Sequence, residues 1–319
     1  MIETPNVEID ESRVWHYTDP SGLEGILANH VIWASSADKM NDPDELLVGG
    51  RTLLDLLAEA ESSIDPAVVD AVAHMVLGIT RNHRHGAYLA SSCWHSDSPT
   101  MWTQYAGTKG YAVVLDAADP LFIRRQSALT PEMVEASGLL GPSDGKRIEE
   151  WAESTPKIPW RWRGVVYTVS DQEAALREGL IALEEAARLT RAGRPAIRGE
   201  LEVMADLANM LDIIKHEGYV DEREKRILCM TMPGAEAPFV RQRGSSGQVI
   251  NYVELGVPQD PTTDLLDGEP EAMGRLPIVG VVVGPDADPD YAVNLLRVHG
   301  YEHVPVSHSG IVYGAERAK

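Results

Sequence analysis

The chain has 319 residues, of which 44% are hydrophobic and 24% are charged, and its formal net charge at pH 7 is −21. This composition is typical of a folded protein with an ordinary apolar core, and it excludes disorder over most of the length. The diffuse acidic charge disfavours non-specific binding to duplex nucleic acid or to an anionic membrane surface.

The two cysteines predict a reducing compartment. Cys93 and Cys229 lie far apart and lack the spacing of a metal site, so we expect reduced, buried thiols. The N-terminal segment lacks the pattern of a signal peptide, and the longest apolar run, 278–283, is too short to span a bilayer. We therefore expect a cytoplasmic protein without a membrane span.

The first half of the chain opens on a predicted strand at 14–18 that ends in polar residues. Asp19 and Pro20 favour a helix start directly after it, and Asn29 favours the helix end. Further along, strands are expected at 31–35, 88–94 and 111–116, helices at 45–60 and 66–81, and a short helix from Ser98 through Met101, Trp102 and Tyr105.

The second half is expected to contain strands at 164–169, 226–230, 249–253, 278–283 and 304–306, and helices at 171–192, 198–216 and 289–299. The segments 233–247 and 259–273 are predicted to be surface loops. Strands that arrive in pairs, at uneven spacing and with helices between them, favour an α+β fold with a mixed, mostly antiparallel sheet. We expect one principal domain over 1–319, with helical insertions at 117–160 and 171–217.

Several short motifs follow one another along nearly the whole chain. They are His16-Tyr17-Thr18, Gly25-Ile26-Leu27, Trp33-Ala34-Ser35, Asn41-Asp42-Pro43 with Glu45, Cys93-Trp94, Met101-Trp102 with Tyr105-Ala106 and Gly110, Lys215-His216, the charged stretch 222–226, and Val283-Gly284-Pro285. In this order they resemble an uncharacterised bacterial family, the domain of unknown function 2971. That resemblance implies a shared fold but assigns no chemistry.

The opening of the chain also resembles the ADP-ribosyltransferase folds, which begin with a strand bearing His-x-Thr, a capped helix and a short strand. The resemblance implies that His16 contacts the ribose of NAD and that an aromatic side chain stacks on nicotinamide. Glu222 and Glu224 are similar to the Glu-x-Glu pair of arginine-directed members. That similarity implies that Glu224 is catalytic and that Glu222 positions the acceptor.

The candidates near the N-terminus each have a structural explanation as well. His16 either contacts a ribose hydroxyl or is a core histidine bonded to the backbone. In a strand only Thr18, and not Tyr17, shares its face. Thr18 either presents its hydroxyl to a ligand or simply precedes the helix cap. Asn41 either hydrogen-bonds a base or amide edge, with Asp42 or Glu45 bound to a sugar, or these residues cap a turn and helix start.

The later candidates are also open to two interpretations. Trp102 and Tyr105 are expected to share one helix face, where they stack on a ligand ring or belong to the core. Glu222, Glu224 and Arg226 alternate along an expected strand and would point the same way. Two neighbouring acids raise one pKa and can supply a general base, whereas a Glu224–Arg226 ion pair would be structural.

The sequence thus predicts an enzyme that cleaves NAD, as its substrate, at the nicotinamide–ribose bond and transfers ADP-ribose to an unidentified acceptor. The candidate catalytic residues are Glu224, Glu222 and His16, and the candidate NAD-binding residues are His16, Tyr17, Thr18, Asn41, Trp102, Tyr105 and Arg226. Two alternatives stay open: a non-catalytic sensor or defence protein that binds a nucleotide or a partner protein, and a metal-dependent hydrolase or nuclease.

Overall fold

The computed structural model describes residues 12–40, 46–60, 64–83, 86–136, 157–194, 198–231, 234–245, 247–260, 265–266 and 268–311. Within these ranges the strands are β1 (Arg13–Thr18), β2 (Val31–Ser36), β3 (Ala87–Cys93), β4 (Tyr111–Asp116), β5 (Phe122–Ile123), β6 (Arg163–Gly164), β7 (Glu224–Met230), β8 (Val240–Ser245), β9 (Gln248–Pro258), β10 (Met273–Gly274), β11 (Ile278–Val283) and β12 (Val306–His308).

The helices flank and connect these strands. They are α1 (Pro20–Asn29), α2 (Val48–Ala60), α3 (Pro66–His83), α4 (Pro99–Met101), α5 (Pro131–Ala136), α7 (Val169–Arg191), α8 (Glu200–Leu211) and α9 (Pro289–Val298), with 3₁₀ turns η1 (Ala37–Lys39) and η3 (Glu217–Glu222) and a π-helical turn η2 (Trp102–Ala106). Among the described residues no helix is both long and apolar enough to cross a membrane.

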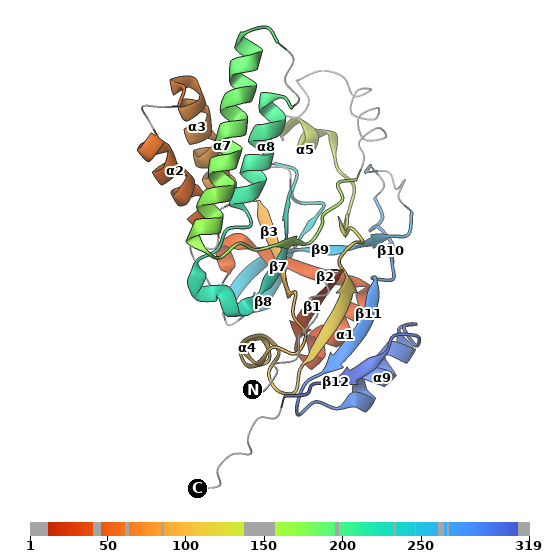
Figure 1. The fold of residues 1–319 in the computed structure, drawn as a ribbon. Helices are drawn as coiled ribbons and strands as arrows, with labels where there is room; N and C mark the ends of the chain where they lie inside the picture. The colour runs from red at the N-terminus through yellow and green to blue at the C-terminus, as the bar shows by residue number, and fades with distance from the viewer. Residues whose placement is uncertain are drawn as a thin grey trace, which may run out of the picture.

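The strands form a twelve-stranded sheet whose main path runs β10–β9–β2–β3–β1–β4–β11–β12 (Figure 1). Pairing between the described strands is antiparallel except between β11 and β12. The prediction of an α+β fold with a mixed, mostly antiparallel sheet is therefore confirmed. Both cysteines are free and buried, as expected.

The main core lies where α1 and α9 cover the sheet. Leu23, Ile26 and Leu27 of α1 pack on the strands together with Ala292 and Leu296 of α9. The helix start was predicted correctly, because the Asp19 side chain accepts a hydrogen bond from the Gly22 amide at 2.7 Å. This cap fixes the direction in which the chain leaves β1.

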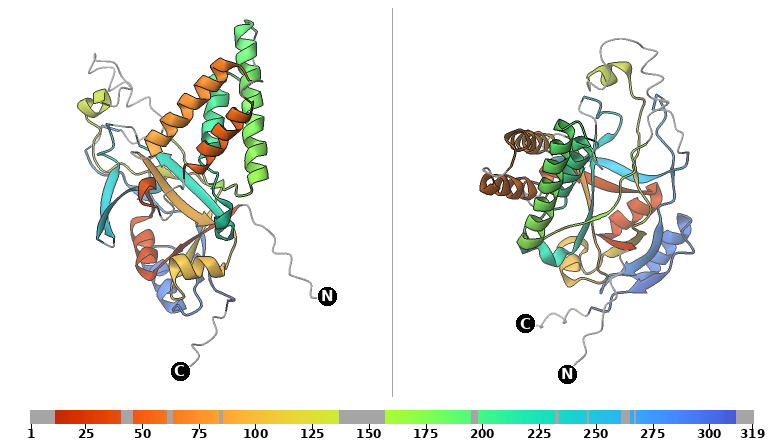
Figure 2. Two further views of the ribbon diagram at one scale, coloured as in Figure 1. Left: turned by 90° about the vertical axis from the view of Figure 1, so that its left-hand side faces the viewer. Right: turned by 45° about the horizontal axis from the view of Figure 1, so that its top comes forward.

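Four helices form a separate layer at one end of the sheet. Figure 2 shows α2, α3, α7 and α8 side by side, projecting from the sheet as one group. Their buried face forms its own apolar cluster, with Leu53, Val72, Leu176 and Leu207 at its centre. Because these side chains cover one another, the layer does not depend on the sheet for its core.

The predicted insertion 171–217 contains most of α7, all of α8 and the start of η3. The described parts of 117–160 hold β5, the short α5 and a bridge between Leu121 and Trp160. The division of the chain into one principal domain and two insertions stays a prediction.

The sequence-based predictions for two segments of secondary structure were wrong. The strand expected at 164–169 is limited to β6 at its start and one parallel bridge between Val166 and Ile214, because α7 already begins at Val169. The segment 233–247, predicted as a loop, contains β8, which pairs with β9 across a turn at Gly247 with a φ of 79°. The polar residues of β8 gave no apolar periodicity to detect.

Candidate functional site

A fork in the sheet creates the candidate site. Along one edge β3 pairs with β7 over its full length, and along the other edge its start pairs with β2 while its end pairs with β1. Residues 90–92 therefore have no strand partner on that second edge. Because β1 and β2 diverge here, a hollow opens between them beside α1.

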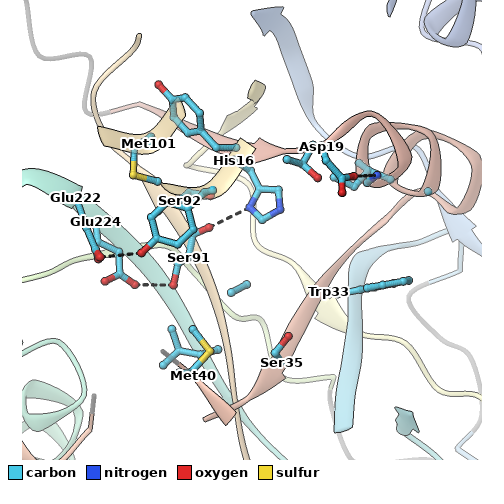
Figure 3. A pocket seen from close by; sticks show the side chains of 18 of the residues that line it. His16, Asp19, Trp33, Ser35, Met40, Ser91, Ser92, Met101, Glu222 and Glu224 are labelled. Atoms are coloured by element: carbon cyan, nitrogen blue, oxygen red, sulfur yellow. Dashed lines mark hydrogen bonds between the residues drawn. The ribbon is translucent and has the colours of Figure 1, made fainter. Parts of the chain in front are cut away.

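The hollow is a cleft of about 560 Å³, which is within the usual range for a ligand site. Its walls come from β1, α1, β2, β3, η2, η3, β7 and β8 (Figure 3). Six of the residues predicted to be functional line it: His16, Tyr17, Thr18, Tyr105, Glu222 and Glu224. The N-terminal strand, the middle helix and the late acids predicted from the sequence thus meet at one cleft.

His16 forms a hydrogen bond to the unpaired edge of β3 and also lines the cleft. Its Nδ1 lies 2.9 Å from the Ser91 carbonyl oxygen, which β-pairing leaves free. A carbonyl only accepts, so Nδ1 carries the proton and Nε2 of the neutral ring is an acceptor. Among the described residues Nε2 has no hydrogen-bond partner. Burial lowers the pKa of His16, and the bond to Ser91 offsets part of this effect.

The two acids meet at one lysine. Lys215 Nζ lies 2.7 Å from Glu222 Oε2 and 3.1 Å from Glu224 Oε2, and all three side chains are buried. The prediction that both acids lie on one strand was wrong. Glu222 ends the 3₁₀ turn η3, Arg223 adopts a left-handed conformation with a φ of 46°, and only Glu224 belongs to β7. This turn directs Glu222 toward Tyr105, whose hydroxyl donates to Oε1 at 2.7 Å.

Glu224 is fully occupied by protein donors. Oε1 accepts from Ser91 Oγ at 2.6 Å and from Arg226 Nε at 3.1 Å. Oε2 accepts from Arg226 Nη2 at 2.7 Å and from Lys215. These bonds use all of the roughly four lone-pair sites of a carboxylate. The Glu224–Arg226 ion pair, one of the two predicted interpretations, is therefore present.

Charge also distinguishes the acids. Burial alone would raise the pKa of Glu224, but the positive charges of Arg226 and Lys215 outweigh it and lower the pKa below its ordinary value. Arg226 is 1% exposed and lies behind Glu224, not in the cleft lining. Within the described ranges Glu222 accepts from Tyr105 and Lys215 alone, which leaves about two lone-pair sites for a ligand.

The expectation that Trp102 and Tyr105 share a face was wrong. The segment is a π-helical turn, which holds more residues per turn than an α-helix and so separates positions three apart. Trp102 is completely buried and donates to Asp97 at 2.8 Å, whereas Tyr105 is 40% exposed at the cleft. Only Tyr105 is placed to contact a ligand.

The remaining predicted residues divide by strand alternation. Thr18 lies on the same side of β1 as His16 and lines the cleft. Tyr17 borders the cleft, but its ring lies on the other side of β1 and packs edge-on against the Trp102 ring, with 4.7 Å between the two centroids. Its hydroxyl accepts a hydrogen bond from the Ser98 amide at 2.9 Å. The last predicted residue, Asn41, lies outside the described residues, as do its neighbours at 42 and 45.

Several cleft residues had no role in the sequence-based prediction. Ser91 links the two sides, because its carbonyl holds His16 and its hydroxyl holds Glu224. Two serines in an otherwise buried strand were a usable signal, since buried hydroxyls need partners. Trp33 and Lys215 appeared only in the family motifs, and Arg243 fell in a predicted loop.

Comparisons with known proteins give no assignment: no family model, no curated protein and no solved structure matches this chain. The resemblances to the domain of unknown function 2971 and to ADP-ribosyltransferases therefore stay predictions. In the described part of the chain no group of three or more His, Cys, Asp or Glu residues is arranged to hold a metal ion.

Proposed function

We propose that this chain cleaves NAD at the nicotinamide–ribose bond and transfers ADP-ribose to an acceptor, as the resemblance to ADP-ribosyltransferases implies. The observation that carries the proposal is one cleft that offers an unpaired imidazole nitrogen, an exposed aromatic ring and a carboxylate with open lone pairs. These groups match a ribose hydroxyl, a nicotinamide ring and a developing positive charge.

In the proposed reaction the bond between ribose C1′ and the nicotinamide nitrogen breaks, and its electron pair leaves with neutral nicotinamide. The ribose becomes oxocarbenium-like, and the Glu222 carboxylate stabilises that charge. His16 Nε2 accepts a hydrogen bond from a ribose hydroxyl. The acceptor, or water, then bonds to C1′ and loses its proton to Glu222.

The proposal exchanges the roles that the resemblance gave to the two acids. Glu224 is 3% exposed with its lone pairs occupied, whereas Glu222 is 8% exposed with lone pairs to spare. Glu224 is therefore a positioning residue that holds Lys215 and Ser91, and through them Glu222 and His16. Glu222 is the proposed catalytic residue.

The test measures nicotinamide released from NAD by the purified protein. We expect Glu222→Gln to reduce the rate by about a hundredfold or more, because the amide carries no charge to stabilise the ribosyl cation. Lys215 keeps Glu224 as a partner, so the variant should still fold, which a thermal melt checks. Absence of nicotinamide release by the wild-type protein, or full activity of the variant, would refute the proposal.

A second variant tests whether the cleft itself is the site. A Cβ at Gly25 meets no atom within 4 Å, and Gly25 lines the cleft, so Gly25→Leu should place a side chain in the ligand space. Gly78 in α3 also has no atom within 4 Å and lies outside the cleft lining. We expect Gly25→Leu to abolish NAD cleavage and Gly78→Leu to preserve it.

The same assay separates the alternatives. NAD binding without release of nicotinamide would favour the non-catalytic sensor, which uses the same cleft for recognition alone. Hydrolysis that requires a divalent metal and is indifferent to NAD would favour the hydrolase. Loss of NAD cleavage in Gly78→Leu as well as in Gly25→Leu would contradict the assignment of the reaction to the cleft.

A further inference from the structure

Arg243 is a cation on the wall of the cleft. Its Nη2 donates to Ser35 Oγ at 3.1 Å, and its Nε is buried without a hydrogen-bond partner. Among the described residues no acid forms an ion pair with it. Its neighbour on β8, Arg241, is paired with Glu254 at 3.3 Å. In a chain of net charge −21, a lone cation lining a cleft calls for an anionic ligand.

Trp33 stands beside this cation and lines the same cleft. Trp33 is 42% exposed, although the guanidinium of Arg243 lies 5.4 Å from the centroid of its ring and the ring centroid of Tyr252 lies 4.6 Å from it. Trp33 and Ser35 are two residues apart on β2, so both point to one face of the strand. An aromatic ring that is held by a neighbouring ring can stack on a planar base, and the cation beside it can bind a phosphate joined to that base.

Trp33 and its neighbour Ser35 lie away from the acids Glu222 and Glu224. Figure 3 shows Trp33 and Ser35 on one side of the cleft, Glu222 and Glu224 on the other, and His16 between them. A ligand that reaches both sides must be elongated, with its anionic and aromatic part remote from the group held near Glu222. A single small sugar or a free amino acid does not meet this requirement.

We propose that Arg243, Ser35 and Trp33 form a subsite for a nucleoside diphosphate, with the base against Trp33 and a phosphate on Arg243 and Ser35. This inference deepens the proposed function, because it assigns the adenosine diphosphate half of NAD to the β2–β8 side of the cleft. It rests on that function only for the orientation of NAD. The affinity for a diphosphate itself follows from the subsite.

The test is isothermal titration calorimetry of the 319-residue chain with ADP, adenosine and inorganic pyrophosphate. We expect wild-type protein to bind ADP at least tenfold more tightly than adenosine or pyrophosphate, a difference of about 1.4 kcal/mol for each tenfold step. Arg243→Gln should remove the preference of ADP over adenosine, and Trp33→Leu should remove the preference of ADP over pyrophosphate.

Arg241→Gln is the matched control, because it removes a positive charge from the same strand outside the cleft lining. It should leave ADP affinity unchanged. Equal affinity of the wild-type protein for ADP and adenosine, no ADP binding, or equal losses in the Arg243 and Arg241 variants would overturn the subsite. ADP has no bond to nicotinamide, so ADP binding without NAD cleavage would refute the proposed NAD-cleaving activity and retain the subsite. NAD cleavage that is unchanged in Arg243→Gln would refute the subsite alone.

Discussion

At the scale of single residues, Ser91 and Glu224 hold the site together. Ser91 accepts from His16 through its backbone and donates to Glu224 through its side chain, so one serine fixes groups that lie 75 and 133 positions away in the chain. Glu224 in turn forms ion pairs with Arg226 and Lys215, and the three side chains make a buried cluster. A buried charge cluster is stable only while each charge has its partner.

Glu224→Gln should therefore destabilise the protein strongly. The neutral amide removes the carboxylate charge that both Arg226 and Lys215 contact, and breaking a buried ion pair costs about 3–5 kcal/mol. Urea unfolding of the wild-type and variant proteins measures the difference. Glu222→Gln is the comparison, since its carboxylate is less enclosed, and it should cost less. Equal losses in the two variants would contradict the central role of Glu224.

His16 should make stability depend on pH. Its pKa in the folded protein lies below the ordinary value of 6.5, mainly because burial disfavours the charged ring. As pH falls through about 6.5, the unfolded chain takes up a proton that the folded protein resists, so the free energy of unfolding decreases. This contribution is complete above the unfolded pKa and is lost as pH falls toward the folded one.

We expect the wild-type protein to lose stability relative to His16→Asn between about pH 7.5 and about pH 5.5 in urea titrations. Asparagine offers an amide donor for the Ser91 carbonyl but does not titrate. His74→Asn, at an exposed position on α3, is the control for general histidine effects. A constant difference between wild type and His16→Asn across this range would show that the ring titrates as it does in water.

At the scale of elements, close approach of two helices fixes the helical layer. A Cβ at Gly49 of α2 would lie 2.7 Å from the Leu211 carbonyl oxygen and 2.9 Å from Leu211 Cα at the end of α8. These are backbone atoms, so the helices themselves would have to separate. The glycine is thus required by packing, although it lowers helix propensity.

Gly49→Ala should lower the free energy of unfolding by about 1–3 kcal/mol, as overpacking does in other cores. Gly78→Ala in α3 meets no atom within 4 Å and should instead stabilise the protein by about 0.5–1 kcal/mol through helix propensity. Thermal unfolding of both variants measures the two effects. A stabilising Gly49→Ala would mean that α2 and α8 are not in close contact.

At the scale of the whole molecule, local patterns predicted most elements and the fold class. Asp19 and Pro20 predicted the position of α1, and the valines of 278–283 predicted β11, because helix caps and apolar runs depend only on residues close together in the sequence. The convergence of β1, η2 and η3 at one cleft was predicted only through resemblance to a known fold. No local pattern specifies which strands become neighbours.

Other features of the site depend on geometry that appears only in the folded chain. The π-helical turn separated Trp102 from Tyr105, and the left-handed Arg223 turned Glu222 out of the expected strand. The fork at β3 arises from pairing among β1, β2 and β7, whose residues are far apart in sequence. Each of these follows from tertiary contacts that override local propensity.

The fork also sets the order in which function can arise during synthesis. His16 and Ser91 belong to the first third of the chain, but Lys215 and Glu222 follow more than a hundred residues later, and Arg243 later still. A nascent polypeptide that ends before these residues contains the His16 and Ser91 side of the cleft but lacks the lysine, the acid and the arginine of the other sides. Because domains generally fold as units, the cleft is completed only after the last third of the chain has emerged from the ribosome. If the proposed function holds, fragments that end before Lys215 release no nicotinamide from NAD, because they lack Lys215 and Glu222.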